Sequence, residues 1–326
     1  MLTGLFCLKN NMKLLFTADV HIKLGQKNVP LDWARNRFQL FVEQFGKMQE
    51  SADMVVIGGD VFDRLPTMDE VELYFDLVAS VTKPTVIYPG NHEMLKKDST
   101  FLTFLKKSTN RLNSLVTVVD EFSTINGVDF VPYNKLKELE KTDFNFAKNV
   151  LCTHVRGEIP PHVKPEVDLD IFNGWQTVLA GDLHSYENSQ RNILYPGSPY
   201  TTSFHRHHVD TGVILFDTTT HEHEWLKFNL PQLIKLTVHA GEAMPATDFD
   251  HTIYEVEGDM AELSLVENSE LISSKVVKRD TDSALLLDPE MSLLEEVKEY
   301  LTYILELPET TVEKTLKEMQ NYADKL

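Results

Sequence analysis

Up to residue 217, hydrophobic residues form short runs of strand length that alternate with stretches of helical spacing. We expect buried strands at residues 12–19, 54–57, 85–88, 116–119, 129–131, 150–152, 177–179, 193–195 and 212–217. Helices are expected at residues 32–48, 68–81 and around 101–105. This order predicts the α/β or α+β class, with one mixed sheet or two packed sheets and the helices outside.

After Pro231 the pattern changes, and a separate small α/β domain is expected. Residues 233–238, 252–256 and 275–277 read as strands, and residues 260–269 include a helical piece. Two capping-box patterns follow in the tail, one from Ser292 to Glu295 and one from Thr310 to Glu313, and each precedes an apolar stripe. They predict a helical hairpin too short to bury both stripes alone, so we expect it to dock on the body of the protein or on a partner.

These changes in pattern predict the domain organisation. Met12 stands just before the first strand, so residues 1–11 are expected to be a dispensable leader. The main domain is expected at residues 12–231, the small domain at residues 232–287 and the hairpin at residues 288–326.

Composition narrows the class of protein. With 42% hydrophobic and 25% charged residues, the chain has an ordinary globular composition, and no apolar run approaches membrane-span length. Two cysteines in 326 residues make no disulfide framework, which favours a reducing compartment such as the cytoplasm. The formal net charge of −19 disfavours unaided binding to DNA, so a nucleic-acid substrate would require bound cations or a partner.

Side chains that bind metals gather where the predicted strands end. They are Asp19, His21, Asp60, Asn91, His92, His154, Asp182 and His184. The pairs at i and i+2 point the same way from an extended chain, and the glycine before Asp60 permits a tight turn. The mixture of oxygen and nitrogen ligands suits Mn²⁺, Fe²⁺ or Zn²⁺ better than Ca²⁺. Two such ions close together could clamp a phosphoryl group.

The motifs D-x-H, GGD-x-F-D, GNHE, H and G-x-x-H, in this order, resemble the calcineurin-like metallophosphoesterase superfamily. Within it, the chain is similar to the nuclease subunits of SbcCD-type double-strand-break repair complexes. The segments that carry this likeness are residues 19–25, 58–63 and 195–200. The likeness covers roughly residues 12–230 at the level of motifs. In the tail, only the order of the domains is similar. The compact length is similar to that of virus-encoded members.

The resemblance implies a two-sheet β-sandwich core flanked by helices, a small capping domain and a C-terminal hairpin. It also implies two divalent ions, Mn²⁺ first, with Mg²⁺, Fe²⁺ or Zn²⁺ as alternatives. One ion would be held by Asp19, His21 and His184, the other by Asn91, His154 and Asp182, with Asp60 between them. His92 would contact the scissile phosphate and stabilise or protonate the leaving oxygen. The family usually has histidine at position 182, so the carboxylate of Asp182 puts metal preference there in question.

The same resemblance implies DNA as the substrate, in repair, recombination or replication. It implies an SMC-like ABC ATPase bound through the hairpin, and a homodimer through the helices near residues 68–81 and 101–105.

For several other polar residues, a purely structural role is an alternative to a functional one. Asp63 and Glu93 are expected to orient ligands, and Arg64 would either contact a substrate phosphate or form a surface salt bridge. Ser198 and His205 are candidates for ligand support or substrate contact, with a polar loop as the alternative for His205. We expect His221 and His223 to alternate on an exposed strand, and Cys152 to be a small buried hydrophobe.

Two other functions compete with the nuclease. A protein phosphatase or small-molecule phosphodiesterase would share much of the site, but the phosphoprotein phosphatases have glycine where this chain has Ile22. The region after Pro231 also has no role in that reading. A non-catalytic scaffold that lost a metal is the other alternative, supported only by Asp182.

Overall fold

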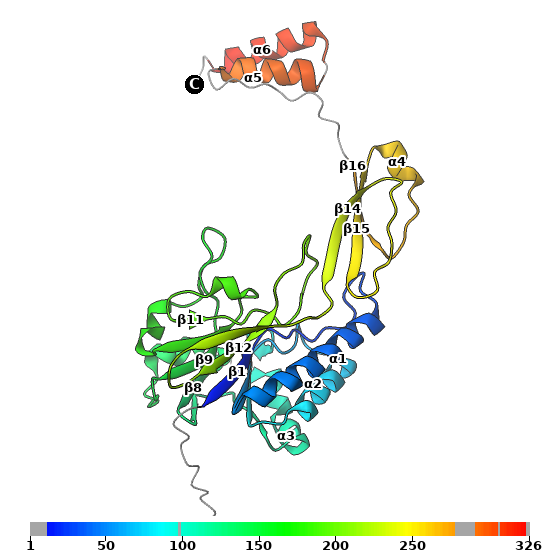
Figure 1. The fold of residues 1–326 in the computed structure, drawn as a ribbon. Coiled ribbons are helices and arrows are strands. Elements are labelled where there is room, and N and C mark those ends of the chain that lie inside the picture. Colours follow the sequence, from blue (N-terminus) through cyan, green and yellow to red (C-terminus); the bar gives the residue numbers. More distant parts are fainter. Residues whose placement is uncertain (1–11, 97–98, 278–290, 306, 324–326) are drawn as a thin grey trace, which may run out of the picture. The chain divides into compact units, whose positions relative to one another are not determined.

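The computed structural model describes residues 12–96, 99–277, 291–305 and 307–323 of the chain. Two sheets form the core of the chain up to residue 227 (Figure 1). The six-stranded sheet has the order β13 (His223–Lys227), β12 (Gly212–Asp217), β1 (Lys13–Thr17), β2 (Met54–Gly58), β3 (Thr85–Tyr88), β6 (Val116–Val118). The five-stranded sheet has the order β11 (Ile193–Leu194), β10 (Thr177–Gly181), β9 (Val150–His154), β8 (Val128–Val131), β7 (Ser123–Ile125). The sequence left open one mixed sheet or two packed sheets, and the structure has two.

Most neighbouring strands in both sheets are parallel. β1, β2, β3 and β6 run parallel, while β12 is antiparallel to β1. In the other sheet β8, β9, β10 and β11 run parallel, with β7 antiparallel at the edge. Parallel strands end at the same edge of a sheet, so the loops after β1, β2, β3, β9 and β10 can build one site.

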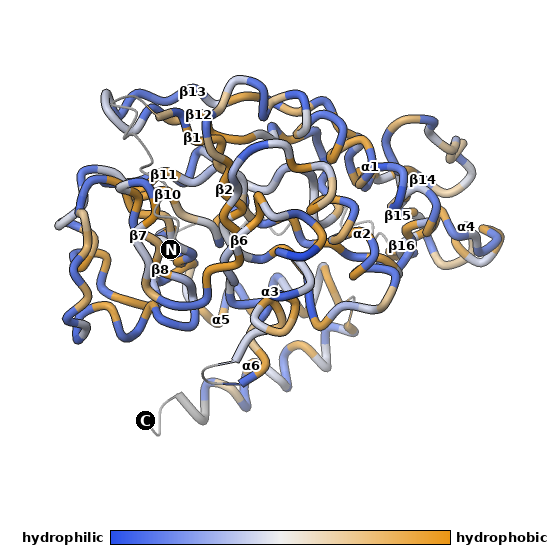
Figure 2. The backbone as a smooth tube through the Cα atoms, turned by 90° about the horizontal axis from the view of Figure 1, so that it is seen from below, coloured by the Kyte–Doolittle hydropathy of each residue, from blue (hydrophilic) through white to orange (hydrophobic). Residues whose placement is uncertain are grey.

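Alternation along each strand sends side chains into two different cores. In β1, Leu15 packs with the helices, whereas Leu14 and Phe16 pack against the other sheet. The helix layer consists of α1 (Leu31–Met48), α2 (Met68–Ser80) and α3 (Phe101–Leu112), which Figure 1 shows together on one side of the six-stranded sheet. In Figure 2 the tube of β1 and β2 is mostly orange, as expected for strands buried on both faces.

The outer face of the five-stranded sheet is covered without a long helix. Its residues Leu151 and Val178 pack against Leu136, Phe172 and Trp175. These come from the 3₁₀ segments Tyr133–Lys141 and Leu169–Gly174 and the residue after the second.

The strands and helices that the sequence predicts up to residue 217 are all present in the structure, with ends shifted by a few residues.

The part after Pro231 contains a three-stranded sheet of β14 (Leu233–His239), β15 (His251–Gly258) and β16 (Ile272–Val277), and the helix α4 (Met260–Leu265). Contacts divide the chain into two compact units. The second unit comprises Val238–Glu242, Val256–Asn268 and the chain from Ser274 onward. The domain limits predicted at residues 231 and 287 stay predictions, and the expected leader at residues 1–11 lies outside the described residues.

The tail has the expected helical pair. The helix α5 (Leu293–Glu299) begins at Ser292, whose capping box with Glu295 is formed, and continues as a π-helical turn over Tyr300–Ile304. The second helix, α6, spans Glu309–Ala323. The capping box predicted at Thr310 is wrong, because α6 begins at Glu309 and Thr310 already lies inside the helix, while the carbonyl of Pro308 accepts from the N–H groups of Thr311 and Val312. Among the described residues, no helix combines the length and apolar character needed to cross a membrane.

Candidate metal centre

The predicted ligands lie where the strands of the two sheets end. Asp19 and His21 follow β1, Asp60 follows β2, Asn91 and His92 follow β3, His154 ends β9, and Asp182 and His184 follow β10. The backbone of Asp19, His21, Asp60 and Asp182 is left-handed, with φ of 56°, 46°, 48° and 100°. Such conformations are costly for non-glycine residues and concentrate at functional sites.

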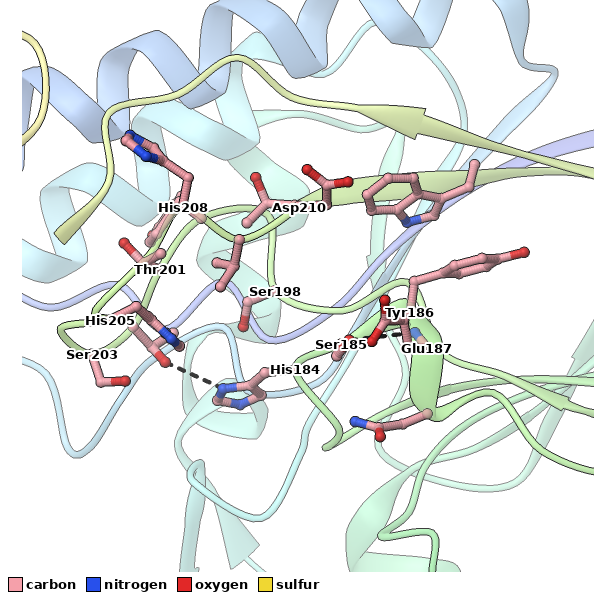
Figure 3. A pocket seen from close by; sticks show the side chains of 16 residues that line it. His184, Ser185, Tyr186, Glu187, Ser198, Thr201, Ser203, His205, His208 and Asp210 are labelled. Atoms are coloured by element: carbon pink, nitrogen blue, oxygen red, sulfur yellow. Dashed lines mark hydrogen bonds between the residues drawn. The ribbon is translucent and has the colours of Figure 1, made fainter. Parts of the chain in front are cut away.

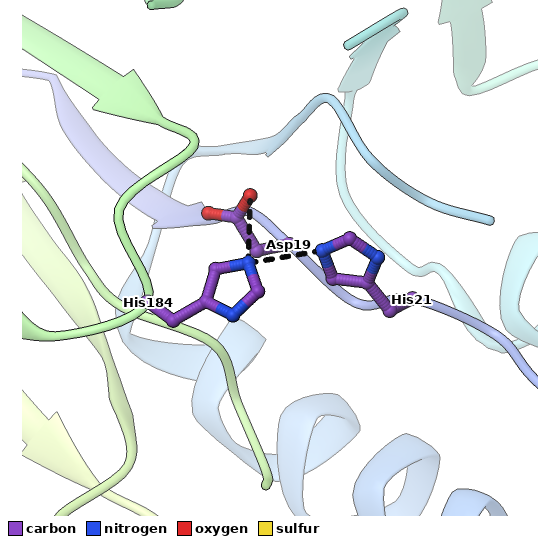
Figure 4. A group of neighbouring side chains, drawn as sticks. All are labelled: Asp19, His21 and His184. Atoms are coloured by element: carbon purple, nitrogen blue, oxygen red, sulfur yellow. Dashed lines mark hydrogen bonds and ion pairs between the residues drawn. The ribbon is translucent and has the colours of Figure 1, made fainter. Parts of the chain in front are cut away.

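The first group of candidate ligands is formed by Asp19, His21 and His184 (Figure 4). The two histidine Nε2 atoms lie 3.1 Å apart, and Asp19 Oδ1 lies 3.9 Å from His184 Nε2. Ligands of one ion bound at about 2.1 Å lie roughly 3–3.5 Å from each other. The distance between the two histidines lies in this range, and the distance from Asp19 to His184 exceeds it by 0.4 Å, so a small shift of the Asp19 carboxylate or of the His184 ring would bring the three donors to the spacing of one divalent ion.

The second group is formed by Asp19, Asp60 and His154. His154 Nε2 lies 3.4 Å from Asp60 Oδ2 and 2.9 Å from Asn91 Oδ1. Asp60 Oδ2 also lies 3.7 Å from His21 Nε2. One carboxylate oxygen thus faces both groups, which is the arrangement that a bridging ligand requires.

His92 lies beside both groups but is held differently. Its backbone N–H donates to Asp60 Oδ1 at 2.9 Å, and its Nδ1 lies 2.5 Å from the carbonyl oxygen of Asp63. Because a carbonyl oxygen only accepts, Nδ1 carries a hydrogen and Nε2 is the nitrogen left for the site. Nε2 lies 3.8 Å from Asp60 Oδ2, and the side chain is 38% exposed. His92 could also complete a third group of donors with His21 and Asp60.

Burial and crowding of charge shift the pKa values in this centre. Burial lowers the pKa of His21 to about 3, so the ring is a neutral donor at neutral pH. Burial would raise the pKa of Asp60, but His154, His21 and His92 lower it below the usual range. Burial lowers the pKa of His154, yet the carboxylates around it, Asp60 first, outweigh this and raise it well above its ordinary value. If the proton shared by His154 and Asp60 were removed, the imidazole nitrogen and the carboxylate would be free to bind a cation.

Glu93 ties the loops of the centre together. Its buried carboxylate accepts from the backbone N–H groups of Asp60, Phe62 and Gly90, at 3.0, 2.8 and 2.7 Å. Burial, followed by the charge of Asp60, raises the pKa of Glu93 to about 7. These contacts are those of a residue that orients ligand loops.

Asp182 is turned toward an arginine rather than into either group. Arg156 Nε donates to Asp182 Oδ2 at 3.1 Å, and Arg156 Nη2 donates to Asp182 Oδ1 at 3.4 Å. The backbone N–H of Asp182 donates to both carboxylate oxygens of Asp19, at 3.0 and 3.2 Å. Asp182 Oδ1 lies 3.9 Å from His154 Nε2, so its position is close to the second group.

The remaining candidates lie around the centre in different roles. Asp63 forms an ion pair with Lys23 at 2.8 Å. Arg64 forms one with Glu70 at 2.9 Å, so a salt bridge is present, but its acidic partner is buried and not at the surface. The hydroxyl of Ser198 donates to the Asp19 carbonyl oxygen at 3.0 Å.

Three other expectations have mixed outcomes. Cys152 is fully buried, as predicted, and His223 lies exposed on β13. The expectation for His221 is wrong. It occupies a turn at φ 61°, and its ring contacts Thr177 and Asn149.

A cavity of about 630 Å³ opens beside His184. Figure 3 shows His184, Ser198 and His205 around it. Thr202 also lines it, and its hydroxyl lies 3.2 Å from His184 Nδ1.

The sequence alone did not predict a role for Thr202, because this residue stands in no ligand motif. It also missed Arg156, although that residue stands two positions after His154, the same i, i+2 spacing that relates Asp182 to His184.

Comparison with known proteins gives one matching family and several similar proteins. Residues 12–214 match the family described as Calcineurin-like phosphoesterase. The chain is 39% identical over 323 residues to a protein of Escherichia phage T5 named as a probable exonuclease subunit 1, covering 95% of this chain and 98% of that protein. It is 27% identical over 225 residues to a protein of Invertebrate iridescent virus 6 named as a candidate phosphoesterase, 244L, covering 63% and 76% of the two chains. The crystal structure of TT1561 of Thermus thermophilus aligns with a TM-score of 0.42 and 13% identity, covering 66% of this chain and 98% of that one.

Proposed function

The chain belongs to the calcineurin-like phosphoesterase family, and from this we propose that it is a DNA nuclease that hydrolyses phosphodiester bonds with two divalent metal ions. One observation carries the proposal: two groups of donor atoms meet at a single oxygen of Asp60. The name of the phage relative, an exonuclease subunit, supports DNA as the substrate and membership in a complex. Family membership also favours an enzyme over a scaffold.

The residues divide into two sets of ligands. Asp19, His21 and His184 would hold one ion, while Asn91, His154 and Asp182 would hold the other, with Asp60 shared. Mn²⁺ is the ion that we propose first, because the carboxylate and amide oxygens suit it, while the imidazole nitrogens keep Fe²⁺ and Zn²⁺ as alternatives. When bound, the ions would polarise the phosphoryl oxygens and make water a nucleophile near neutral pH.

His92 is the residue that we assign to proton transfer. The carbonyl oxygen of Asp63 fixes its ring through Nδ1, so Nε2, which lies 3.8 Å from Asp60 Oδ2, is the nitrogen left to meet a substrate. In the doubly protonated ring, Nε2–H could donate to the leaving oxygen as the bond to phosphorus breaks. The 38% exposure of the side chain leaves this nitrogen open to a substrate.

The test is a nuclease assay with Mn²⁺ on labelled duplex and single-stranded DNA. We expect cleavage by the wild type, and a fall in kcat of about 10²–10⁴-fold for His92→Ala. The exposed His239, on β14, supplies the matched control, and His239→Ala should cleave at the wild-type rate. Rapid dephosphorylation of phosphopeptides with DNA left intact would overturn the nuclease proposal. Equal rates for His92→Ala and the wild type would overturn the assignment of the acid.

We further propose that the C-terminal hairpin binds an SMC-like ABC ATPase and that the protein acts in the cytoplasm of a cell. Leu293, Tyr303 and Leu305 are 70%, 58% and 47% exposed, so the hairpin presents apolar side chains that a partner could cover. A homodimer through α2 and α3 is proposed on the same ground, because Met68 and Phe104 are 84% and 76% exposed.

A further inference from the structure

We propose that Arg156 binds a phosphate of the substrate at the edge of the metal centre, with Asp182 as its anchor. The inference rests on the proposed function, because it concerns the substrate of the same site. It assigns to this chain a fixed cation beside the position where the family usually has histidine.

The geometry leaves one edge of the guanidinium open. Arg156 gives Nε and Nη2 to the two oxygens of Asp182, which is a side-on pairing along one edge. Within the part of the chain that the structure describes, no hydrogen bond is formed by Nη1. The Asp182 side chain is 6% exposed and that of Arg156 is 45% exposed, so the pair reaches from the buried centre to solvent. Five N–H donors in a rigid plane allow arginine to hold a carboxylate on one edge and a phosphate on the other.

Arg156 is also held in place through its backbone. Its backbone N–H donates to Glu166 Oε1 at 3.2 Å, and Glu166 Oε2 accepts from the Tyr133 hydroxyl at 2.7 Å. The Tyr133 ring meets the ring of His154 edge to face, with centroids 6.1 Å apart. The arginine is therefore positioned before a substrate arrives, which lowers the entropic cost of binding.

Two other cations near the centre are more fully engaged. Lys23 is paired with Asp63 at 2.8 Å. Arg64 gives Nη1 to Glu70 and Nη2 to the carbonyl oxygen of Leu24, so both of its terminal nitrogens are used. For a chain with a net charge of −19, a half-exposed guanidinium beside the ligands supplies attraction for a polyanion where it is needed.

This position has two opposite consequences. The charge of Arg156 disfavours a cation beside Asp182 and occupies both oxygens of that carboxylate, so it should weaken binding of the second Mn²⁺. The same charge should strengthen binding of the substrate. A residue that only supports the fold would not move these two affinities in opposite directions.

The experiment compares the wild type with Arg156→Gln and Arg156→Lys. Calorimetry measures the affinity for Mn²⁺, and initial rates on DNA and on bis(p-nitrophenyl) phosphate give KM and kcat. For Arg156→Gln we expect the weaker Mn²⁺ site to tighten by about three- to tenfold, and KM to rise by about tenfold with a smaller change in kcat. Arg156→Lys keeps the charge but loses the planar fork, so its Mn²⁺ affinity should stay near the wild type while KM rises.

Arg191 offers the control, because it is 46% exposed and pairs with Asp170 at 2.8 Å outside the metal centre. Arg191→Gln should change neither quantity. Unchanged or weaker Mn²⁺ binding in Arg156→Gln, or an unchanged KM, would overturn the role of Arg156. If the wild type left DNA intact but hydrolysed the small diester, the nuclease proposal would fail, and KM on the small diester would still decide the role of Arg156.

Discussion

His21 and His184 are 163 residues apart in the chain, yet their Nε2 atoms lie 3.1 Å apart. Burial lowers the pKa of both rings, so both are neutral at neutral pH. At least one of the two facing nitrogens then has a free lone pair, and a shared hydrogen or a cation is what makes such an approach favourable. The oxygen of Asp19 on the same side makes the cation the better match.

Metal should therefore stabilise the protein through this pair. We expect saturating Mn²⁺ to raise the melting temperature of the wild type, by the equivalent of about 2.7 kcal/mol at one hundred times the Kd, and excess chelator to reverse it. His21→Ala should lose most of this gain, because it removes a donor from the first group. Thermal unfolding with and without Mn²⁺ measures the effect, with His239→Ala as the control. A full gain in His21→Ala would show that the ion binds elsewhere.

Gly59 should be intolerant of a side chain. It has φ of 85°, and an added Cβ would overlap the ring of His154. Gly25 is the matched control, since its φ is 72° but a Cβ there would meet nothing within 4 Å. We expect Gly59→Ala to cost about 3 kcal/mol or more, and Gly25→Ala only about 1 kcal/mol from backbone strain. Denaturant unfolding of both variants measures the difference, and equal costs would mean that the loop of Gly59 can move away from His154.

Glu93 should give the metal-free protein a pH-dependent stability. Its pKa is 4.5 ordinarily and about 7 in the folded state, so between these values the folded protein holds a proton that the unfolded chain releases. This contribution, about 3 kcal/mol, is fully present below pH 4.5 and is lost as the pH rises through 7. In chelator, Glu93→Gln should lose stability less steeply than the wild type between pH 5 and 7.5.

The comparison for Glu93 is an exposed glutamate on α1. Denaturant unfolding across the pH series should show the wild-type slope for Glu43→Gln. A wild-type slope in Glu93→Gln would assign the pH dependence to other groups of the centre.

Thr202 should position His184 from the side of the cavity. Its hydroxyl lies 3.2 Å from His184 Nδ1, which favours one orientation of the ring. Thr202→Val keeps the shape and removes this bond, so Mn²⁺ affinity measured by calorimetry should fall by about tenfold. Thr202→Ser retains the hydroxyl and should bind Mn²⁺ nearly as the wild type does. Weakening by both substitutions would indicate that packing of the methyl group matters instead.

The sequence predicted most of the donor atoms because each one follows an apolar strand within a few residues. Asp19 and Asp60 stand next to β1 and β2, and a strand end is visible without knowledge of the fold. The order of the strands in two sheets was not visible. Strands buried on both faces show no alternation that would say which sheet they join.

Contacts between distant segments were also hidden. Arg156 meets Asp182 across 26 residues, and Thr202 meets His184 across 18 residues. Arginine and threonine are not ordinary metal ligands, so their roles depend on how the loops after β9, β10 and β11 are brought together. His221 was misread for a related reason: a turn at φ 61°, rather than a strand, directs its ring toward Thr177.

The hairpin gives the last prediction, because its buried and exposed apolar residues can be separated. Leu301 and Val312 are 9% and 3% exposed, while Leu293 and Tyr303 are 70% and 58% exposed. Glutamate at Leu293 and Tyr303 should leave the helices folded, since it alters side chains that face solvent. It should abolish co-elution, in gel filtration, with the SMC-like ATPase from the same genome, because a charge would have to be buried at the interface. Nuclease activity of the isolated protein on single-stranded DNA should not change.

Glutamate at Leu301 is the contrasting variant. It should unfold the hairpin, which circular dichroism would detect as a loss of helical signal. Undiminished co-elution of the Leu293 and Tyr303 double variant would place the partner surface elsewhere on the chain.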